Sequence, residues 1–239
     1  MGKKTWYWIL AILAVIVVAV LLYANFVNKP DGNSSANGGG HNTMTHGEMD
    51  HGQSNAPEDS PLRLYETEQD ALMSAMMQDM NNIPNSGNAA IDFLTGMIPH
   101  HQAAVSMAES YLNHGGAHSL LKPLAQDIIT AQTEEINQME SMLATIQAKG
   151  AQDEEQANAY LEAYHKGMHH DMTHSAADNI DAAFAAGMIV HHQMAVDMAN
   201  AIQPYTTEEE VLALARTIIE TQEEEIGSMQ SVLDASNVA

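Results

Sequence analysis

The sequence of 239 residues has no cysteine, few basic residues and few aromatic residues. Without cysteine it can form neither a disulfide nor a thiolate metal site, and it cannot be a lipoprotein, whose lipid is attached to cysteine. Only eight Lys and Arg residues stand against 31 Asp and Glu residues, which gives a formal net charge of −23. Because such a chain repels the phosphate backbone, we exclude nucleic acid as a partner. Aromatic residues make up 5% of the chain, so Met and Ala must fill most of the core.

Methionine and histidine are abundant instead, with 17 and 13 copies, and they occur in a repeat. Residues 96–108 read GMIPHHQAAVSMA and residues 187–199 read GMIVHHQMAVDMA, so ten of thirteen positions are identical at an offset of 91 residues. A second match follows, because residues 132–139 and 222–229 share Gln, two Glu, Ile and Met at the same spacing. A repeat of about 90 residues exceeds the usual solenoid periods and indicates a duplicated helical unit.

An apolar run without charges, Trp6–Val27, is long enough to cross a bilayer as a helix. Lys3 and Lys4 precede it, which places the N-terminus in the cytoplasm by the positive-inside rule. We therefore predict a membrane anchor over residues 1–28, with the rest of the chain periplasmic or extracellular. A cleaved signal peptide is the alternative, although the run exceeds the usual length of such a segment and no clear cleavage site follows it.

Residues 29–60 are rich in Gly, Asn, Ser, Asp and Pro and lack apolar periodicity, which predicts a flexible linker. His and Met alternate within it at steady spacing, a pattern that favours loose capture of a metal ion. A polar tether with incidental histidines is the alternative. The candidate ligands in this linker are His41, Met44, His46, Met49 and His51.

The remaining residues show helical periodicity and no strand pattern, so we predict an all-α fold. The predicted helices cover residues 61–81, 88–113, 119–148, 153–174, 177–203 and 207–235. The duplication divides them into two three-helix units, 61–150 and 151–239. We expect the second and third helices of each unit to form an up-down four-helix bundle, against which the two first helices pack.

Each copy of the His-His motif sets Met and His on one side of a helix, within an arc of about 120°. Adjacent side chains diverge by roughly 100° on a helix. We therefore expect His101 and His192 to be inner ligands, while His100 and His191 serve a second site or the path by which an ion enters. The candidates here are Met97, His100, His101 and Met107, then Met188, His191, His192, Met194 and Met198.

Further Met and His residues lie on the other helices at spacings of three and four, which put side chains within reach of one ion. In the first helix of each unit they are Met73, Met76, Met77 and Met80, then His165, Met168, His169 and Met172. The inward stripes of the third helices hold Met139 and Gln132, then Met229 and Gln222, bordered by Glu135 and Glu225. A Gln or Glu facing a buried His across a helix pair would satisfy it and orient it for a metal. Taken singly, an inward Met or His is more often a core residue than a ligand.

The ligand chemistry favours a soft metal. Thioethers select Cu(I) and, by the same softness, Ag(I), whereas zinc prefers cysteine, histidine and carboxylate. Imidazole in mixed sites could also hold Cu(II). We therefore predict that the chain binds copper, with Cu(I) favoured.

These motifs resemble a bacterial family catalogued as domain of unknown function 305. Its pattern is an aromatic residue, then Met-Ile-x-His-His-x-x-Ala and Met-Ala, and later Gln-x-x-Glu-Ile-x-x-Met. The pattern begins at Phe93 and again at Phe184, and the match covers most of residues 65–235. The resemblance implies a ferritin-like helical bundle and, for the two-copy form, an exported copper-binding protein linked to copper tolerance. The family commonly has an Asp three residues before the aromatic residue, and Asp181 stands there in the second copy, whereas the first copy has Ala90, with Asp92 nearby. The two copies also differ at the x before His-His, where Pro99 is replaced by Val190.

We predict extracytoplasmic binding, buffering or delivery of copper, without catalysis. The expected partners are metal ions and the membrane, together with a copper-exporting or copper-accepting protein, and a homodimer is left open. One alternative is a ferritin-like metal oxidase, which needs Glu together with Glu-x-x-His on paired helices, and only Glu162 and His165 have that spacing. The other is a protein-interaction or sensor ectodomain, which would expose an apolar patch.

Overall fold

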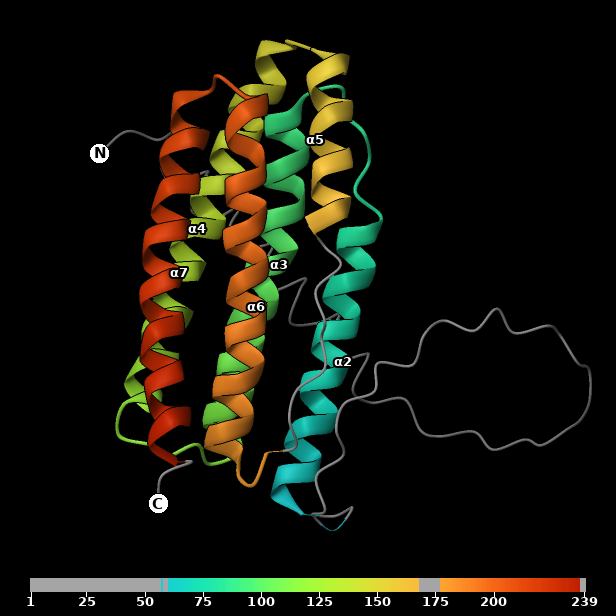
Figure 1. The fold of residues 1–239 in the computed structure, drawn as a ribbon. Coiled ribbons are helices and arrows are strands. Elements are labelled where there is room, and N and C mark those ends of the chain that lie inside the picture. Colours follow the sequence, from blue (N-terminus) through green and yellow to red (C-terminus); the bar gives the residue numbers. More distant parts are fainter. Residues whose placement is uncertain (1–56, 58–59, 168–176, 237–239) are drawn as a thin grey trace, which may run out of the picture. The chain divides into compact units, whose positions relative to one another are not determined.

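The computed structural model describes residue 57, residues 60–167 and residues 177–236 (Figure 1). All of them belong to one compact part of the chain, Glu48–Ala239, which holds both three-helix units. Within these residues the secondary structure is helical and contains no strand, which confirms the predicted all-α fold. The elements are α2 (Pro61–Asn81), α3 (Ala89–Asn113), α4 (Leu121–Lys149), α5 (Glu154–Gly167), α6 (Ile180–Ile202), the short 3-10 helix η1 (Gln203–Tyr205) and α7 (Glu209–Ser236).

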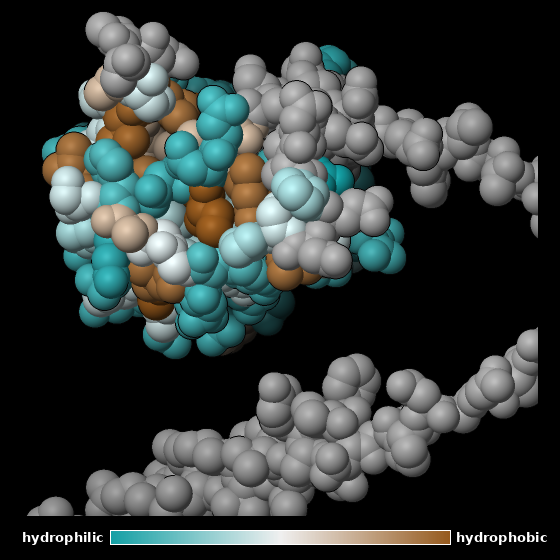
Figure 2. Space-filling model, turned by 90° about the horizontal axis from the view of Figure 1, so that it is seen from below, coloured by the Kyte–Doolittle hydropathy of each residue, from teal (hydrophilic) through white to brown (hydrophobic). Residues whose placement is uncertain are grey.

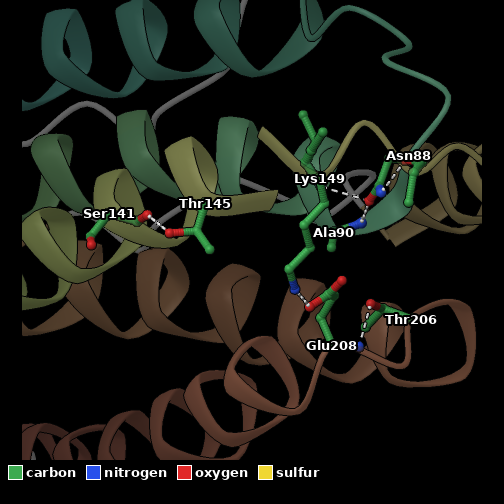
Figure 3. Close-up of polar contacts among 9 residues, drawn as sticks. Asn88, Ala90, Ser141, Thr145, Lys149, Thr206 and Glu208 are labelled. Carbon is green, nitrogen blue, oxygen red and sulfur yellow. Dashed lines mark hydrogen bonds and ion pairs between the residues drawn. The ribbon is translucent and has the colours of Figure 1, made fainter. Parts of the chain in front are cut away.

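Capping residues mark the ends of several helices. The Ser60 hydroxyl accepts a hydrogen bond from the backbone N–H of Arg63 at 3.2 Å, which caps the start of α2. Asn88 caps α3 in the same way, by accepting from the backbone N–H two residues further on at 3.0 Å (Figure 3). At the end of α4, Gly150 has a φ of 64°, a left-handed conformation that glycine adopts without strain.

Four helices form the predicted up-down bundle. α3 runs antiparallel to α4 and to α6, and α6 runs antiparallel to α7 (Figure 1). α3 packs chiefly against α4, and α6 against α7, while the two pairs meet mainly through α3 and α6. α2 and α5 pack against the α3–α6 pair. The two units therefore face each other across a pseudo-two-fold axis that passes between α3 and α6.

Methionine and alanine fill much of the core, as predicted. Tyrosine contributes more to the core than we predicted. The buried methionines of the described residues are Met73, Met76, Met80, Met97, Met107, Met139, Met142, Met188, Met194, Met198 and Met229. The large side chains buried among them include Tyr65, Tyr111, Tyr160, Tyr164, Phe93 and Phe184. Tyr111 on α3 stacks on Phe184 of α6 with ring centroids 4.1 Å apart, so aromatic packing also joins the two units.

The predicted membrane anchor and linker, residues 1–28 and 29–60, fall almost wholly outside the described residues. Within the described part of the chain, no helix is long and apolar enough to cross a membrane. The predicted end of the fourth helix, 168–174, also lies outside, since the described part of α5 stops at Gly167. The anchor and the linker therefore stay predictions.

Candidate metal centre

The first histidines of the two His-His motifs join the two units. His100 on α3 and His191 on α6 are fully buried, and their ring centroids lie 3.8 Å apart. The Nε2 of each lies 3.1 Å from the main-chain carbonyl oxygen of the other. Because a carbonyl only accepts, each Nε2 carries a hydrogen and donates it, which leaves each Nδ1 as an acceptor in the neutral ring. The two histidines thus make reciprocal contacts on the pseudo-two-fold axis.

The second histidines of the motifs contact carboxylates on the neighbouring helix. His101 Nε2 lies 2.9 Å from Glu135 Oε2 on α4, and His192 Nε2 lies 2.7 Å from Glu225 Oε2 on α7. Both imidazole side chains are fully buried, whereas the carboxylates keep exposed fractions of 17% and 13%. The partner expected across each helix pair is therefore a Glu and not a Gln, and it orients the ring.

Burial keeps three of these rings uncharged. It lowers the pKa of His100 and of His191 well below the ordinary value, and neighbouring imidazoles lower it further. Burial also lowers the pKa of His192 to about 3. It raises the pKa of Glu225 to about 7, with a further contribution from the nearby Glu135 carboxylate. A neutral imidazole keeps the lone pair that a metal ion binds.

Two buried methionines lie on one side of each His–Glu contact. Met97 precedes His101 by four residues on α3, and Met139 follows Glu135 by four residues on α4, and both methionines are fully buried. Because α3 and α4 are antiparallel, both steps lead in the same direction along the bundle. The two thioethers therefore lie at one level, about one helical turn from the contact. The second unit repeats this arrangement with Met188, His192, Glu225 and Met229.

Several buried polar atoms of this region have no hydrogen-bond partner among the residues that the structure describes. They are the Nδ1 atoms of His100, His101, His191 and His192 and both amide atoms of Gln132 and Gln222. A buried polar group without a partner costs about 1–3 kcal/mol, and folded proteins hold few of them. The bundle interior thus holds unpaired imidazole nitrogen and amide oxygen as well as thioether sulfur, and nitrogen and sulfur are ligands that a soft ion takes.

The family described as "Domain of unknown function (DUF305)" matches residues 28–143 of the chain and again residues 90–233. The chain belongs to this family. Among solved structures, CopM in its Ag-bound form is 34% identical and covers 61% of this chain and 95% of its own, with a TM-score of 0.47. CopM in its Cu(I)-bound form is 32% identical and covers 61% and 96%, with a TM-score of 0.47. An uncharacterized protein of Acanthamoeba polyphaga mimivirus is 45% identical over 51 residues, and the match spans 33% of that protein and 21% of this chain.

The structure buries part of the ligand set predicted for this DUF305 chain. Buried in it are the four histidines of the motifs and the predicted methionines Met73, Met76, Met80, Met97, Met107, Met139, Met188, Met194, Met198 and Met229. Met77 is half-buried and His165 is exposed. The other predicted ligands lie outside the described residues: His41, Met44, His46, Met49, His51, Met168, His169 and Met172.

In the described part of the DUF305 chain, no three His, Asp or Glu side chains converge closely enough to hold one metal ion. A site built only from nitrogen and charged oxygen ligands, as zinc or a pair of iron ions requires, is therefore not found there. A metal ion bound in this part of the chain would therefore also need a thioether or amide ligand.

Two acidic contacts in this DUF305 chain were not predicted. Asp92 near the start of α3 is fully buried and accepts from the backbone N–H of Ser86 at 2.9 Å, and burial raises its pKa. Asp181 near the start of α6 accepts from the Tyr111 hydroxyl and from two backbone N–H groups of the α3–α4 connection. The family pattern carried a signal for one of them, because an Asp commonly stands three residues before the aromatic residue, as Asp181 does.

Proposed function

We propose that this chain binds Cu(I) and Ag(I) outside the cytoplasm and buffers or delivers them without catalysis. One observation carries the proposal: in each unit a buried His lies one turn from a pair of buried Met residues, and its Nδ1 has no partner among the described residues. Neutral nitrogen and sulfur are the ligands that soft ions take in proteins. CopM has been solved with Ag and with Cu(I), while the ligands proposed here are taken from this chain's own residues.

Charge favours a monovalent ion at this centre. An ion that enters the bundle interior loses its hydration, and the free-energy cost of that loss rises with its charge. Each unit supplies one carboxyl group beside its inner histidine, Glu135 or Glu225, and in its ionised form this group balances one positive charge. We therefore propose Cu(I) or Ag(I) as the main guest and Cu(II) as a weaker one.

The same reasoning gives each of the other parts of the chain a role in metal binding. A formal net charge of −23 attracts cations weakly to the surface. The alternating His and Met of residues 41–51 would collect ions close to the bundle, and the apolar run Trp6–Val27 would hold the chain at the membrane. The two repeats, 61–150 and 151–239, would each contribute one ligand set. A copper-exporting or copper-accepting protein would be the donor or the acceptor of the ion.

Neither alternative predicted from the sequence gains support. Glu162 and His165, which have the spacing of a di-iron motif, are exposed, and Glu162 pairs with Lys166 at 2.7 Å. The exposed large hydrophobic side chains of the described residues are Leu64 and Leu120. At one end of the bundle, apolar patches alternate with hydrophilic ones (Figure 2). A protein-interaction module would be expected to present a larger continuous apolar surface.

The test is an anaerobic competition titration of Cu(I) against a chromogenic chelator, with the full-length chain. Met139→Leu removes one thioether of the centre and roughly conserves its volume. Met142→Leu is the matched control, because Met142 is also buried on α4 while its counterpart in the second unit is Val232. We expect Met139→Leu to weaken binding and Met142→Leu to leave it unchanged.

A second variant tests the whole centre, with His100, His101, His191 and His192 all changed to Ala. Far-ultraviolet circular dichroism must first establish that it keeps its helices. Tight binding that persists in this variant and in Met139→Leu would assign the function to residues 41–51 and to the methionines of α2. No binding by the unaltered chain would refute the proposal.

A further inference from the structure

Gln132 on α4 and Gln222 on α7 are buried polar side chains that the His and Met pattern leaves without a role. They are 3% and 2% exposed, and neither amide atom of either one has a hydrogen-bond partner among the residues that the structure describes. The two are counterparts in the duplication, at an offset of 90 residues. An unpaired amide at both equivalent positions indicates a common function, because a packing accident in one unit would not require a second in the other.

Each of these glutamines lies close along its helix to the glutamate that contacts an inner histidine. Gln132 precedes Glu135 by three residues and Gln222 precedes Glu225 by three, a spacing that puts both side chains of each pair on one helix face. Each Glu contacts an inner histidine, at 2.9 Å and 2.7 Å. The Cα atoms of each Gln and Glu pair are therefore about 4.5 Å apart along the helix axis. Met139 and Met229 lie one turn away on the other side of the same contacts.

The chemistry of a primary amide limits the kinds of guest that these glutamines can bind. Its oxygen is a neutral ligand for a cation, and its NH2 group donates to an acceptor such as a water oxygen. The nearby histidines also present Nδ1 atoms that have no partner among the described residues. A guest that accepts electron pairs from nitrogen and oxygen, or a water molecule bound to that guest, would satisfy both groups. A purely apolar guest would satisfy neither.

We propose that Gln132 and Gln222 belong to the metal site, where the amide oxygen of each binds the ion directly. This inference rests on the proposed function and adds one oxygen donor in each unit to the His and Met ligands. Because the amide is neutral, it does not disturb the balance between a monovalent ion and the single carboxylate of each unit. The ion class is therefore unchanged, and the ligand set is larger than the sequence motifs predict.

The test measures the Ag(I) affinity of the full-length chain by competition with a chelator. The variant Gln132→Leu with Gln222→Leu removes both amides and keeps a similar volume. We expect its Ag(I) affinity to fall about 10- to 100-fold, the range seen when supporting residues of metal sites are removed. We expect the melting temperature of its metal-free form not to fall, because the change removes an unpaired polar group from the core.

The matched control is Gln102→Leu with Gln193→Leu. These two glutamines are also equivalent in the duplication and directly follow the His-His motifs, but they are exposed. Their removal should leave the Ag(I) affinity unchanged. An affinity within about twofold of the unaltered chain in the Gln132 and Gln222 variant would overturn the inference, as would an equal loss in the control. Failure of the unaltered chain to bind Ag(I) would refute the proposed function itself.

A second pair of changes decides the question if the leucine variant does not fold. Gln132→Met with Gln222→Met keeps an unbranched side chain and places a thioether where the amide oxygen was. If these positions reach the ion, the added sulfur should tighten Ag(I) binding beyond that of the unaltered chain. Unchanged or weaker binding by the folded methionine variant would overturn the inference.

Discussion

The change His100→Ala should lower the free energy of unfolding by about 2–5 kcal/mol. The ring is fully buried and lies 3.8 Å from the ring of His191, so its removal opens a cavity, and such changes cost about 2–5 kcal/mol. The lost hydrogen bond from Nε2 to the carbonyl of His191 adds about 1 kcal/mol, and the removal of the unpaired Nδ1 of the same ring offsets about as much. The reciprocal bond survives, because it is made to the main-chain carbonyl of residue 100, which alanine retains.

Urea unfolding followed by far-ultraviolet circular dichroism measures this loss. The samples must be free of metal, since a bound ion stabilises the folded state and would mask part of the difference. His191→Ala should cost the same within about 1 kcal/mol, because the two histidines make equivalent contacts across the pseudo-two-fold axis. A whole domain is stable by only about 5–15 kcal/mol, so either variant should unfold at a clearly lower urea concentration.

The double variant of His100 and His191 makes the test sharper. The two rings touch, so the second removal no longer loses their mutual packing. The sum of the single losses should therefore exceed the loss in the double variant by about 1 kcal/mol, the value of an aromatic pair. Single losses below about 1 kcal/mol, or single losses that simply add, would refute the description of these histidines as the contact that joins the units.

Glu225→Gln should gain stability relative to the unaltered chain as the pH rises from about 4.5 to about 7. Burial raises the pKa of Glu225 to about 7, so its contribution to stability is fully present below the unfolded pKa and is lost as pH rises through the folded one. Urea unfolding across this range measures the difference, and a difference that does not change with pH would contradict the raised pKa. Gly116→Ala should destabilise more than Gly115→Ala, because a methyl group at Gly116 overlaps the buried ring of Tyr111. At Gly115 a methyl group meets no described atom within 4 Å, and the φ of 88° adds strain of about 1 kcal/mol, so equal losses in thermal melts would contradict this packing. Tyr111→Phe should cost about 2 kcal/mol, since its hydroxyl donates to the Asp181 carboxylate, and an unchanged melting temperature would show that this bond contributes nothing.

Helical periodicity and capping residues predict the six described helices and the inward faces of the four bundle helices, because both signals are local. The contact between His100 and His191 could not be predicted in the same way. It depends on the register between α3 and α6, whose motifs lie 91 residues apart in the sequence. We expected these two histidines to serve a second site or the path of ion entry, and that role stays a prediction. The structure places both at the centre of the bundle, fully buried.

Two other features of the structure also depend on long-range contacts. The buried tyrosines were not predicted, because tyrosine is intermediate in burial and a helical stripe does not show which ones face the core. The stripes did indicate that Glu135 and Glu225 border the core, but not that each contacts a specific histidine. That contact requires the facing helix to be placed, and it determines which imidazole nitrogen is left for a ligand.

The adjacency of the two histidines in each motif follows from the geometry of the bundle. Neighbouring residues on a helix diverge by roughly 100°, so His100 faces α6 of the other unit while His101 faces α4 of its own. Two histidines spaced by three or four residues would share one face, and a single motif could not then serve both helix pairs. Both histidines keep an Nδ1 without a partner among the described residues, but the first also joins the units, while the second lies beside the methionine pair of its own unit. Loss of the first should therefore appear chiefly in stability, and loss of the second chiefly in metal binding.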